Sequence, residues 1–181
     1  MGFRLSYIAL ALLIAVCAYA SSIEFWGVSI RFNFGLPSRP FVLSARALDS
    51  AVTITATDLN NYDVQFNWVN AYYNDYVELN LSFVTAINVT LGIHIYTVSG
   101  LAENGYLYVV ATKYCYVKVP GYIYSPNGCL NYEVTLLKAN TNSNTAIMVN
   151  GYPGGYLILR IRINNWGTGT GYVKLGVSAS V

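Results

Sequence analysis

Apolar and polar residues alternate with a period of two along much of the chain, and the alternation is strictest in residues 28–35. One face of this segment carries Val28, Ile30, Phe32 and Phe34, and the residues between them are polar or small. Because successive side chains of a β-strand point to opposite faces, the pattern predicts an amphipathic strand with four large apolar side chains on one face.

Further runs of alternating or continuous apolar residues follow, separated by clusters rich in Asn, Asp, Gly and Pro that predict turns. The runs cover residues 41–48, 52–56, 62–70, 77–83, 87–95, 106–119, 130–137, 156–163 and 172–177. Many short strands at roughly ten-residue spacing are typical of a β-sandwich or barrel. Residues 41–51 form the only alanine-bearing stretch compatible with a helix, so we expect an all-β domain.

The first 20 residues have the layout of a secretory signal peptide. Arg4 precedes an apolar run over residues 5–16, and Ala18 and Ala20 form a small-x-small cleavage site before Ser21. The alternative is a retained membrane anchor, but the apolar run is shorter than the roughly 20 residues that span a bilayer. We therefore expect a mature chain that begins near Ser21, is exported, and has no membrane segment after cleavage.

Two prolines, Pro37 and Pro40, interrupt the alternation directly after the first strand. Proline lacks a backbone donor and favours extended backbone before it, so this segment predicts a tether. The expected organisation is a signal peptide over residues 1–20, an N-terminal strand over 21–35, the tether over 36–40 and a single β-sandwich domain over 41–181.

The composition narrows the range of functions. The 181 residues include 10 Lys plus Arg and 8 Asp plus Glu, for a formal net charge of +2. So small a basic excess argues against a nucleic-acid binder, whose affinity depends on neutralising phosphates. A hydrophobic content of 55% with 10% charged residues argues against disorder.

The cysteines predict one disulfide. Cys17 leaves with the signal peptide, and an even pair in an exported chain, Cys115 and Cys129, is most simply a bridge. Turn residues at 120–121 and 126–128 lie between them and favour a hairpin cross-link. The alternative is a metal pair, but zinc takes four ligands and His94 is the only imidazole in the chain.

The candidate chemistry is sparse. The acids are scattered singly, and His94 falls on the polar face of residues 87–95, where it is interpreted as a solvated strand residue. The chain has no nucleophile elbow, no phosphate loop and no His pair at metal spacing. We therefore predict no catalytic, cofactor-binding or metal-binding residues, with a secreted hydrolase built on paired carboxylates as the third-ranked interpretation.

Two glycosylation sequons begin at Asn80 and Asn88, and both asparagines fall on the polar faces of predicted strands. Two sequons are about as many as chance gives in a chain this rich in Asn, Ser and Thr. Glycosylation at these positions is therefore a candidate modification with an unmodified strand face as its alternative.

Tyrosine is unusually frequent, with 17 residues in the chain. Seven of them, which we call the tyrosine cluster, are Tyr72, Tyr73, Tyr76, Tyr114, Tyr116, Tyr122 and Tyr124. Planar rings with polar tips suit a sugar-stacking face, whereas their high strand propensity suits packing and subunit contact. We favour packing and subunit contact.

The apolar face of residues 28–34 is too large to leave in water without cost. One solution is that the strand is the first strand of its own sandwich. The other is that it inserts into an incomplete sandwich of a neighbouring copy, as in donor-strand complementation. Head-to-tail donation does not close on itself, so it produces a filament of identical subunits.

The order of signal peptide, short amphipathic strand and β-sandwich resembles the donor-strand pilins of thermophilic archaea, the bundling pili and threads, and is similar to the TasA-like and camelysin-like fibre subunits of bacteria. The stretch over residues 150–167, with Pro153-Gly154, a strand, Asn165-Trp166-Gly167 and a further strand, is similar to the ending of that family. The resemblance implies a jelly-roll-like sandwich and a non-enzymatic, extracellular filament subunit with the N-terminal strand as donor. A secreted carbohydrate-binding or cell-surface module, with surfaces or glycans as partners, is the alternative.

Overall fold

The computed structural model describes residues 23–25, 28–30, 39–165 and 169–181. The chain forms two compact units, residues 1–38 and residues 39–181, and each is described by itself. The predicted signal peptide, with Cys17, and residues 36–38 of the predicted tether lie outside the described residues.

The first unit contains two short strands, β1 (Ile23–Phe25) and β2 (Val28–Ile30). They pair antiparallel in a two-stranded sheet, with Ile23 opposite Ile30 and Phe25 opposite Val28. The segment predicted as one strand thus contains two paired strands in the part that the structure describes.

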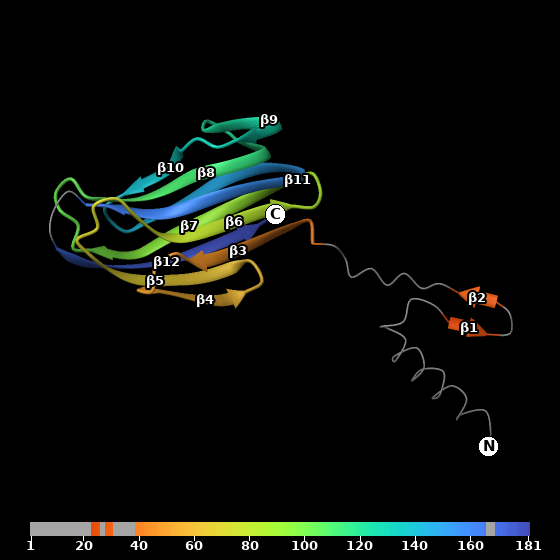
Figure 1. The fold of residues 1–181 in the computed structure, drawn as a ribbon, viewed down its shortest axis with the longest axis horizontal. Helices are drawn as coiled ribbons and strands as arrows, with labels where there is room; N and C mark the ends of the chain where they lie inside the picture. Colours follow the sequence, from red (N-terminus) through yellow and green to blue (C-terminus); the bar gives the residue numbers. More distant parts are fainter. Residues whose placement is uncertain (1–22, 26–27, 31–38, 166–168) are drawn as a thin grey trace, which may run out of the picture. The chain divides into compact units, whose positions relative to one another are not determined.

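The second unit is built from ten strands that pair antiparallel throughout (Figure 1). They are β3 (Phe41–Ala47), β4 (Val52–Asp58), β5 (Asn61–Val69), β6 (Asn74–Phe83), β7 (Ile87–Ser99), β8 (Tyr106–Val119), β9 (Ile123–Leu130), β10 (Val134–Ala139), β11 (Ser143–Asn164) and β12 (Thr170–Ser180). The all-β prediction is confirmed, and the stretch weighed as a helix, residues 41–51, contains strand β3 instead.

The strands form two layers that share the long strand β11. Its first part, over residues 143–151, pairs with β7, and β12, β5 and β4 follow in order; we call this layer B. Its second part, over residues 156–164, lies between β6 and β8, and β3, β9 and β10 extend this second group, which we call layer A. The pairing of β11 with both layers makes one continuous ten-stranded sheet that folds into a sandwich.

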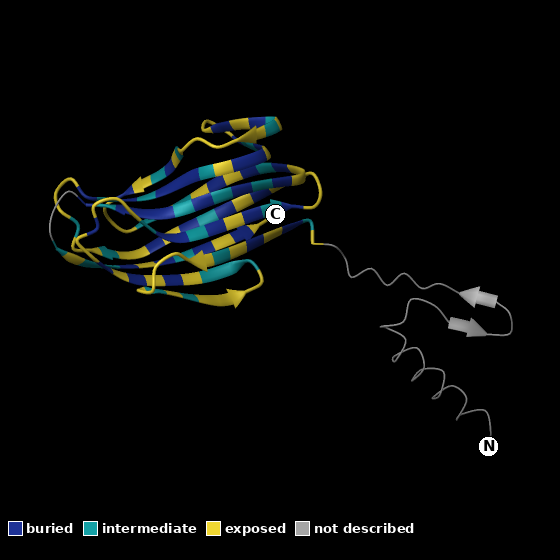
Figure 2. Ribbon diagram, viewed as in Figure 1, coloured by how far each residue is buried: buried dark blue, intermediate teal, exposed yellow. Residues whose placement is uncertain are grey.

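The core follows directly from the period-two pattern. Figure 2 shows buried and exposed residues alternating along the strands of the second unit. In β7, for example, Leu91, Ile93 and Ile95 are fully buried, whereas His94 between them is exposed. Each buried aliphatic side chain contributes roughly 1.5–3 kcal/mol, so one contiguous core formed by both layers stabilises the domain.

Strand β11 corrects one part of the sequence prediction. The Gly- and Pro-rich cluster over residues 150–155, one of the clusters that predicted turns before the run 156–163, is instead an irregular segment of the strand, where the register with β8 shifts. Gly154 adopts a φ of 75°, and a Cβ on Gly155 would lie 2.7 Å from the carbonyl oxygen of Tyr116. The glycines therefore let the strand bend from one layer into the other without breaking it.

Candidate functional site

The predicted donor residues fall in the first unit. Val28 and Ile30 belong to β2, and Phe32 and Phe34 lie outside the described residues. The ten-stranded sheet consists of β3–β12, and β1 and β2 form their own sheet.

Strand β3 is an edge strand of layer A, because its described pairing is with β6 alone. The backbone N–H of Leu43 points away from β6 and donates to Oδ1 of Asn60 (3.3 Å), and its carbonyl accepts from the Tyr62 hydroxyl (2.9 Å). Backbone groups alternate in direction along a strand, so those of Ala45 and Ala47 also point away from β6. These two residues offer a row of backbone groups suited to pairing with an added strand.

The corresponding edge of layer B is β4, which pairs only with β5 among the described strands. Ala45 of β3 and Val52 and Ile54 of β4 are half-buried and pack against the core. The edges of the two layers therefore flank a seam of partly exposed apolar side chains, which we call the β3–β4 seam.

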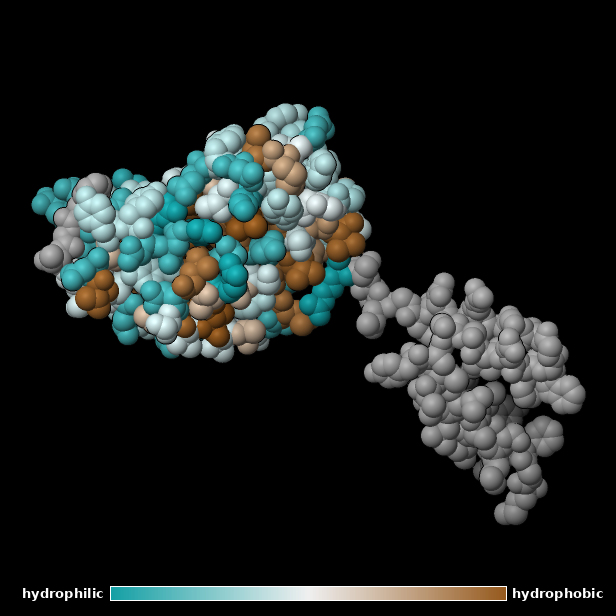
Figure 3. All heavy atoms as spheres, viewed as in Figure 1, coloured by the Kyte–Doolittle hydropathy of each residue, from teal (hydrophilic) through white to brown (hydrophobic). Residues whose placement is uncertain are grey.

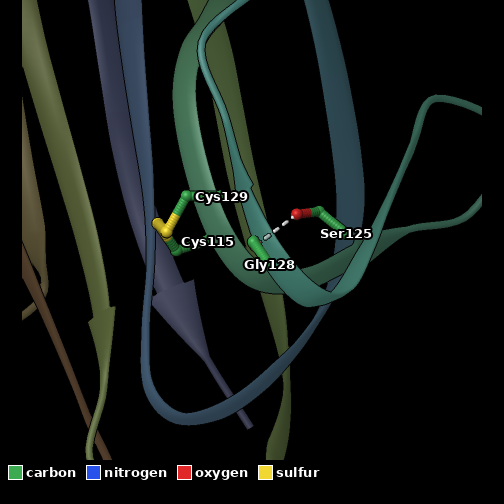
Figure 4. The surroundings of a disulfide bond; sticks show 4 residues. All are labelled: Cys115, Ser125, Gly128 and Cys129. Atoms are coloured by element: carbon green, nitrogen blue, oxygen red, sulfur yellow. Dashed lines mark hydrogen bonds between the residues drawn. A yellow bond between two sulfur atoms is a disulfide. The ribbon is translucent and has the colours of Figure 1, made fainter.

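The predicted disulfide is present and links neighbouring strands. Cys115 of β8 lies directly opposite Cys129 of β9, with 4.0 Å between their Cα atoms. The turn predicted at residues 126–128 is instead a bulge within β9, and the Ser125 hydroxyl donates to the carbonyl oxygen of Gly128 (2.6 Å; Figure 4). The hairpin reverses at residues 120–122, where Gly121 has a φ of 80°.

Both sequon asparagines are exposed. Asn80 lies on the outer face of β6 and Asn88 on the outer face of β7. The hydroxyl of Ser82 in the first sequon donates to the carbonyl oxygen of Val42 (3.4 Å), and Thr90 of the second is exposed. The two positions are accessible, and their modification stays a prediction.

The tyrosine cluster does not form one face. Tyr76 and Tyr114 are buried, and burial raises the pKa of both hydroxyls. Tyr72 and Tyr73 are exposed and directly precede β6. The start of β6 and the start of β8 both pair with the end of β11, so these two tyrosines lie at the end of layer A where β8 begins. Because Tyr122 follows the opposite end of β8, the exposed tyrosines lie at two separate ends of layer A.

A network of ion pairs crosses the outer face of layer A, although the sequence showed only isolated charges. Its members are Arg46, Asp75, Glu78, Glu133, Arg160 and Arg162. At its centre, Arg162 donates to both Glu133 oxygens at 2.8 and 2.9 Å and to Asp75, and its side chain is only 5% exposed. The signal in the sequence was the pair of arginines at i and i+2 within the apolar run 156–163, but partners 29 and 87 residues away carry no local signature.

The ion pairs of this network lower the pKa values of Asp75 and Glu133 and raise the pKa of Arg162. Burial alone would raise the pKa of Asp75, but hydrogen bonds and charge from Arg162 and Arg160 outweigh it and hold the pKa below its ordinary value. Hydrogen bonds from Arg162 likewise lower the pKa of Glu133, and the two carboxylates raise the pKa of Arg162. Tyr73 adds its ring, whose centre lies 4.1 Å from Arg162 Cζ.

The face shown in Figure 3 carries its apolar side chains interspersed among hydrophilic ones. Among residues 39–165 and 169–181 and the two short strands, no group of three His, Cys, Asp or Glu side chains is placed to hold a metal ion. The part of the chain that the structure describes also contains no helix long and apolar enough to cross a membrane.

No family model and no curated protein matches the chain. Among solved structures, the chain is similar to the crystal structure of the enzymatically active domain of tailspike protein 4 from bacteriophage CBA120. The two share 13% identity with a TM-score of 0.29, and the match covers 77% of this chain and 19% of the tailspike chain. The chain thus spans about a fifth of that protein, and the tailspike's activity is not carried over to it.

Proposed function

We propose that the chain is a non-enzymatic structural subunit of an extracellular filament, a pilus or thread that serves adhesion or biofilm formation. In this proposal, the strand around residues 28–34 of one subunit pairs with the sandwich of the next by donor-strand complementation. Each subunit is both donor and acceptor, so the polymer is open-ended.

The observation that carries the proposal is that the N-terminal strands β1 and β2 pair with each other in a sheet of their own. β1 and β2 belong to a different sheet from β3–β12, and the core of the second unit is formed by residues between Phe41 and Ala179. Val28 and Ile30 of the predicted donor face are therefore not among the ten strands of the sandwich, which supports donation to another copy.

The β3–β4 seam supports the same proposal from the acceptor side. An added strand would pair with the outward backbone groups of Ala45 and Ala47 and place alternate apolar side chains against Val52 and Ile54. Main-chain hydrogen bonds supply affinity in this mode and the side-chain pockets supply register. The Cys115–Cys129 bridge is typical of oxidising, extracytoplasmic compartments and supports the proposed location.

The test compares two faces of one strand in the mature chain that begins at Ser21. Ile30→Asp places a charge on the apolar face, and Ser29→Asp places the same charge on the polar face. We expect Ser29→Asp to assemble into filaments like the unmodified chain and Ile30→Asp to remain a folded monomer, measured by sedimentation velocity and negative-stain microscopy. A mature chain that stays monomeric at all concentrations, or equal assembly of both variants, contradicts the proposal.

A further inference from the structure

The outer face of layer B carries a groove that the filament proposal does not use. It has a volume of about 360 Å³ and crosses four strands, β5, β12, β7 and β11, with a contribution from β4. Small-molecule sites have volumes of roughly 300–1,000 Å³, so the groove matches a ligand of one or two sugar-sized rings.

The strand register builds the groove as a row across the sheet. Asp63 of β5 lies opposite Gly176 of β12, Gly176 lies opposite His94 of β7, and His94 lies opposite Asn144 of β11. Neighbouring strands are about 4.8 Å apart, so Asp63 and His94 are roughly 10 Å apart across the sheet, and the Tyr96 phenol reaches over Gly176 between them. The Tyr96 ring is therefore the part of the groove's floor on which a ligand ring would lie.

Two glycines, Gly176 and Gly92, give room to side chains that line the groove. A Cβ on Gly176 would lie 2.9 Å from the hydroxyl oxygen of Tyr96, and a Cβ on Gly92 would lie 2.5 Å from Oγ of Ser178. Glycine in the interior of a central strand weakens the strand, and it often marks a place where another molecule approaches the backbone closely. In both places a neighbouring side chain uses the space that a Cβ would take, Tyr96 over Gly176 and Ser178 beside Gly92, and both side chains line the groove.

The groove is lined by the aromatic rings of His94 and Tyr96, by the carboxylate of Asp63 and by the amide of Asn144. The rings of His94 and Tyr96 stack on each other with centroids 4.3 Å apart, and Tyr96 is 42% exposed. Asp63 and Asn144 are exposed on either side of the row. An aromatic face takes the C–H face of a sugar ring, and a carboxylate and an amide take its hydroxyls as donors and acceptors.

We propose that this groove is a binding site for a neutral saccharide, with Tyr96 and His94 as the ring platform and Asp63 and Asn144 as the hydroxyl-binding groups. Asp63 would repel an anionic sugar at its end of the row, while Lys174 Nζ lies 5.9 Å from the centre of the Tyr96 ring at the other side. The inference does not depend on polymerisation, because every residue of the groove belongs to the sandwich itself.

The experiment is isothermal titration calorimetry of the mature chain with a panel of neutral gluco-, manno- and galacto-tetraoses, and with a sialylated tetraose as the charged comparison. We expect at least one neutral tetraose to bind, the sialylated probe to bind more weakly, and Tyr96→Ala and Asp63→Asn each to lower affinity about tenfold. Tyr124→Ala removes a more exposed tyrosine on β9, outside the groove, and should leave the affinity unchanged.

Each variant is checked for an unchanged melting temperature, and Gly176→Ala, which forces Tyr96 to move, provides a second route to the same loss. The proposal is overturned if no neutral probe binds, or if binding survives in Tyr96→Ala and Asp63→Asn. It is also overturned if Tyr96→Ala alters only self-association, which would make the groove a subunit interface. Assembly of Ile30→Asp is measured separately, so failure of the filament proposal and failure of the saccharide site give different results.

Discussion

At the scale of single residues, Arg162 joins parts of layer A that lie far apart in the chain. It extends from β11 to Asp75 at the start of β6 and to Glu133 in the connection between β9 and β10. A buried guanidinium needs several acceptors, and its fork geometry is satisfied by these two carboxylates at once. The network therefore holds the β9–β10 connection against the sheet.

Removing Arg162 should lower the stability of the fold much more than removing Arg46, which lies at the rim of the network. We expect Arg162→Met to lower the free energy of unfolding by roughly 3 kcal/mol, the low end for breaking a buried pair, because Glu133 is half exposed. The matched control is Arg46→Met, whose side chain is 68% exposed and whose pair with Glu78 is worth about 0–1 kcal/mol. Urea denaturation measures both, and equal losses would show that Arg162 has no special role.

The same network predicts how stability depends on pH. Asp75 and Glu133 have folded-state pKa values below their ordinary values of 3.8 and 4.5. A carboxyl of this kind contributes stability that is complete above its unfolded pKa and is lost as the pH falls through its folded pKa. We therefore expect the melting temperature to fall steeply below about pH 4, and to fall less steeply in Arg162→Met. Parallel curves for the two proteins would contradict the assignment.

At the scale of elements, the regular strands were predictable because one face of each is buried and the other is not. Residues 87–95 predicted β7 from Val89, Leu91 and Ile93, and all three are fully buried. Strand β9 was not predicted, because Ser125, Pro126, Asn127 and Gly128 are residues that favour turns. In the structure these residues form a bulge, because β9 pairs with β8 on both sides of them and the disulfide joins the two strands. A bulge and a turn use the same residues, so local sequence does not separate them.

The candidate groove was beyond prediction for a related reason. The alternation placed His94 on an exposed face, and the structure confirms that placement. Its neighbours across the sheet, Asp63, Gly176 and Asn144, come from three other strands, and their alignment depends on register. Register is set by pairing over the whole sheet, which a single chain segment does not encode.

The disulfide makes a prediction for the β8–β9 hairpin. The bridge joins residues 14 apart in sequence, and closing a loop of about this length in the unfolded chain is worth roughly 3 kcal/mol. We expect the double variant Cys115→Ser, Cys129→Ser to unfold at correspondingly lower denaturant. Proteolysis of the folded variant should begin within residues 120–128. Mass spectrometry of the unreduced chain should find the two cysteine peptides linked, and two free thiols would contradict the pairing.

At the scale of the whole molecule, β3 and β4 are edge strands among the strands that the structure describes, and β2 of the predicted amphipathic segment belongs to another sheet. Exposed edges invite pairing with other chains, and folded proteins that remain monomeric normally block them. A subunit that polymerises has a reason to keep one edge open, because its donor strand covers that edge in the next copy. The donor and the acceptor are then separable by mutation.

Two variants separate them. Ile30→Asp disables the donor, and Ala45→Pro removes an outward backbone N–H of β3 while leaving its bonds to β6 in place, since that N–H points away from β6. Each variant alone should be a folded monomer. Mixed in equal amounts, they should form a one-to-one dimer and nothing larger, because the Ala45→Pro chain donates to the Ile30→Asp chain and both remaining ends are blocked. Sedimentation velocity distinguishes monomers, one-to-one dimers and filaments. Filaments from Ala45→Pro alone would exclude β3 as the acceptor edge, and a mixture that stays monomeric would show that assembly, if it occurs, does not proceed by pairing this donor with this edge.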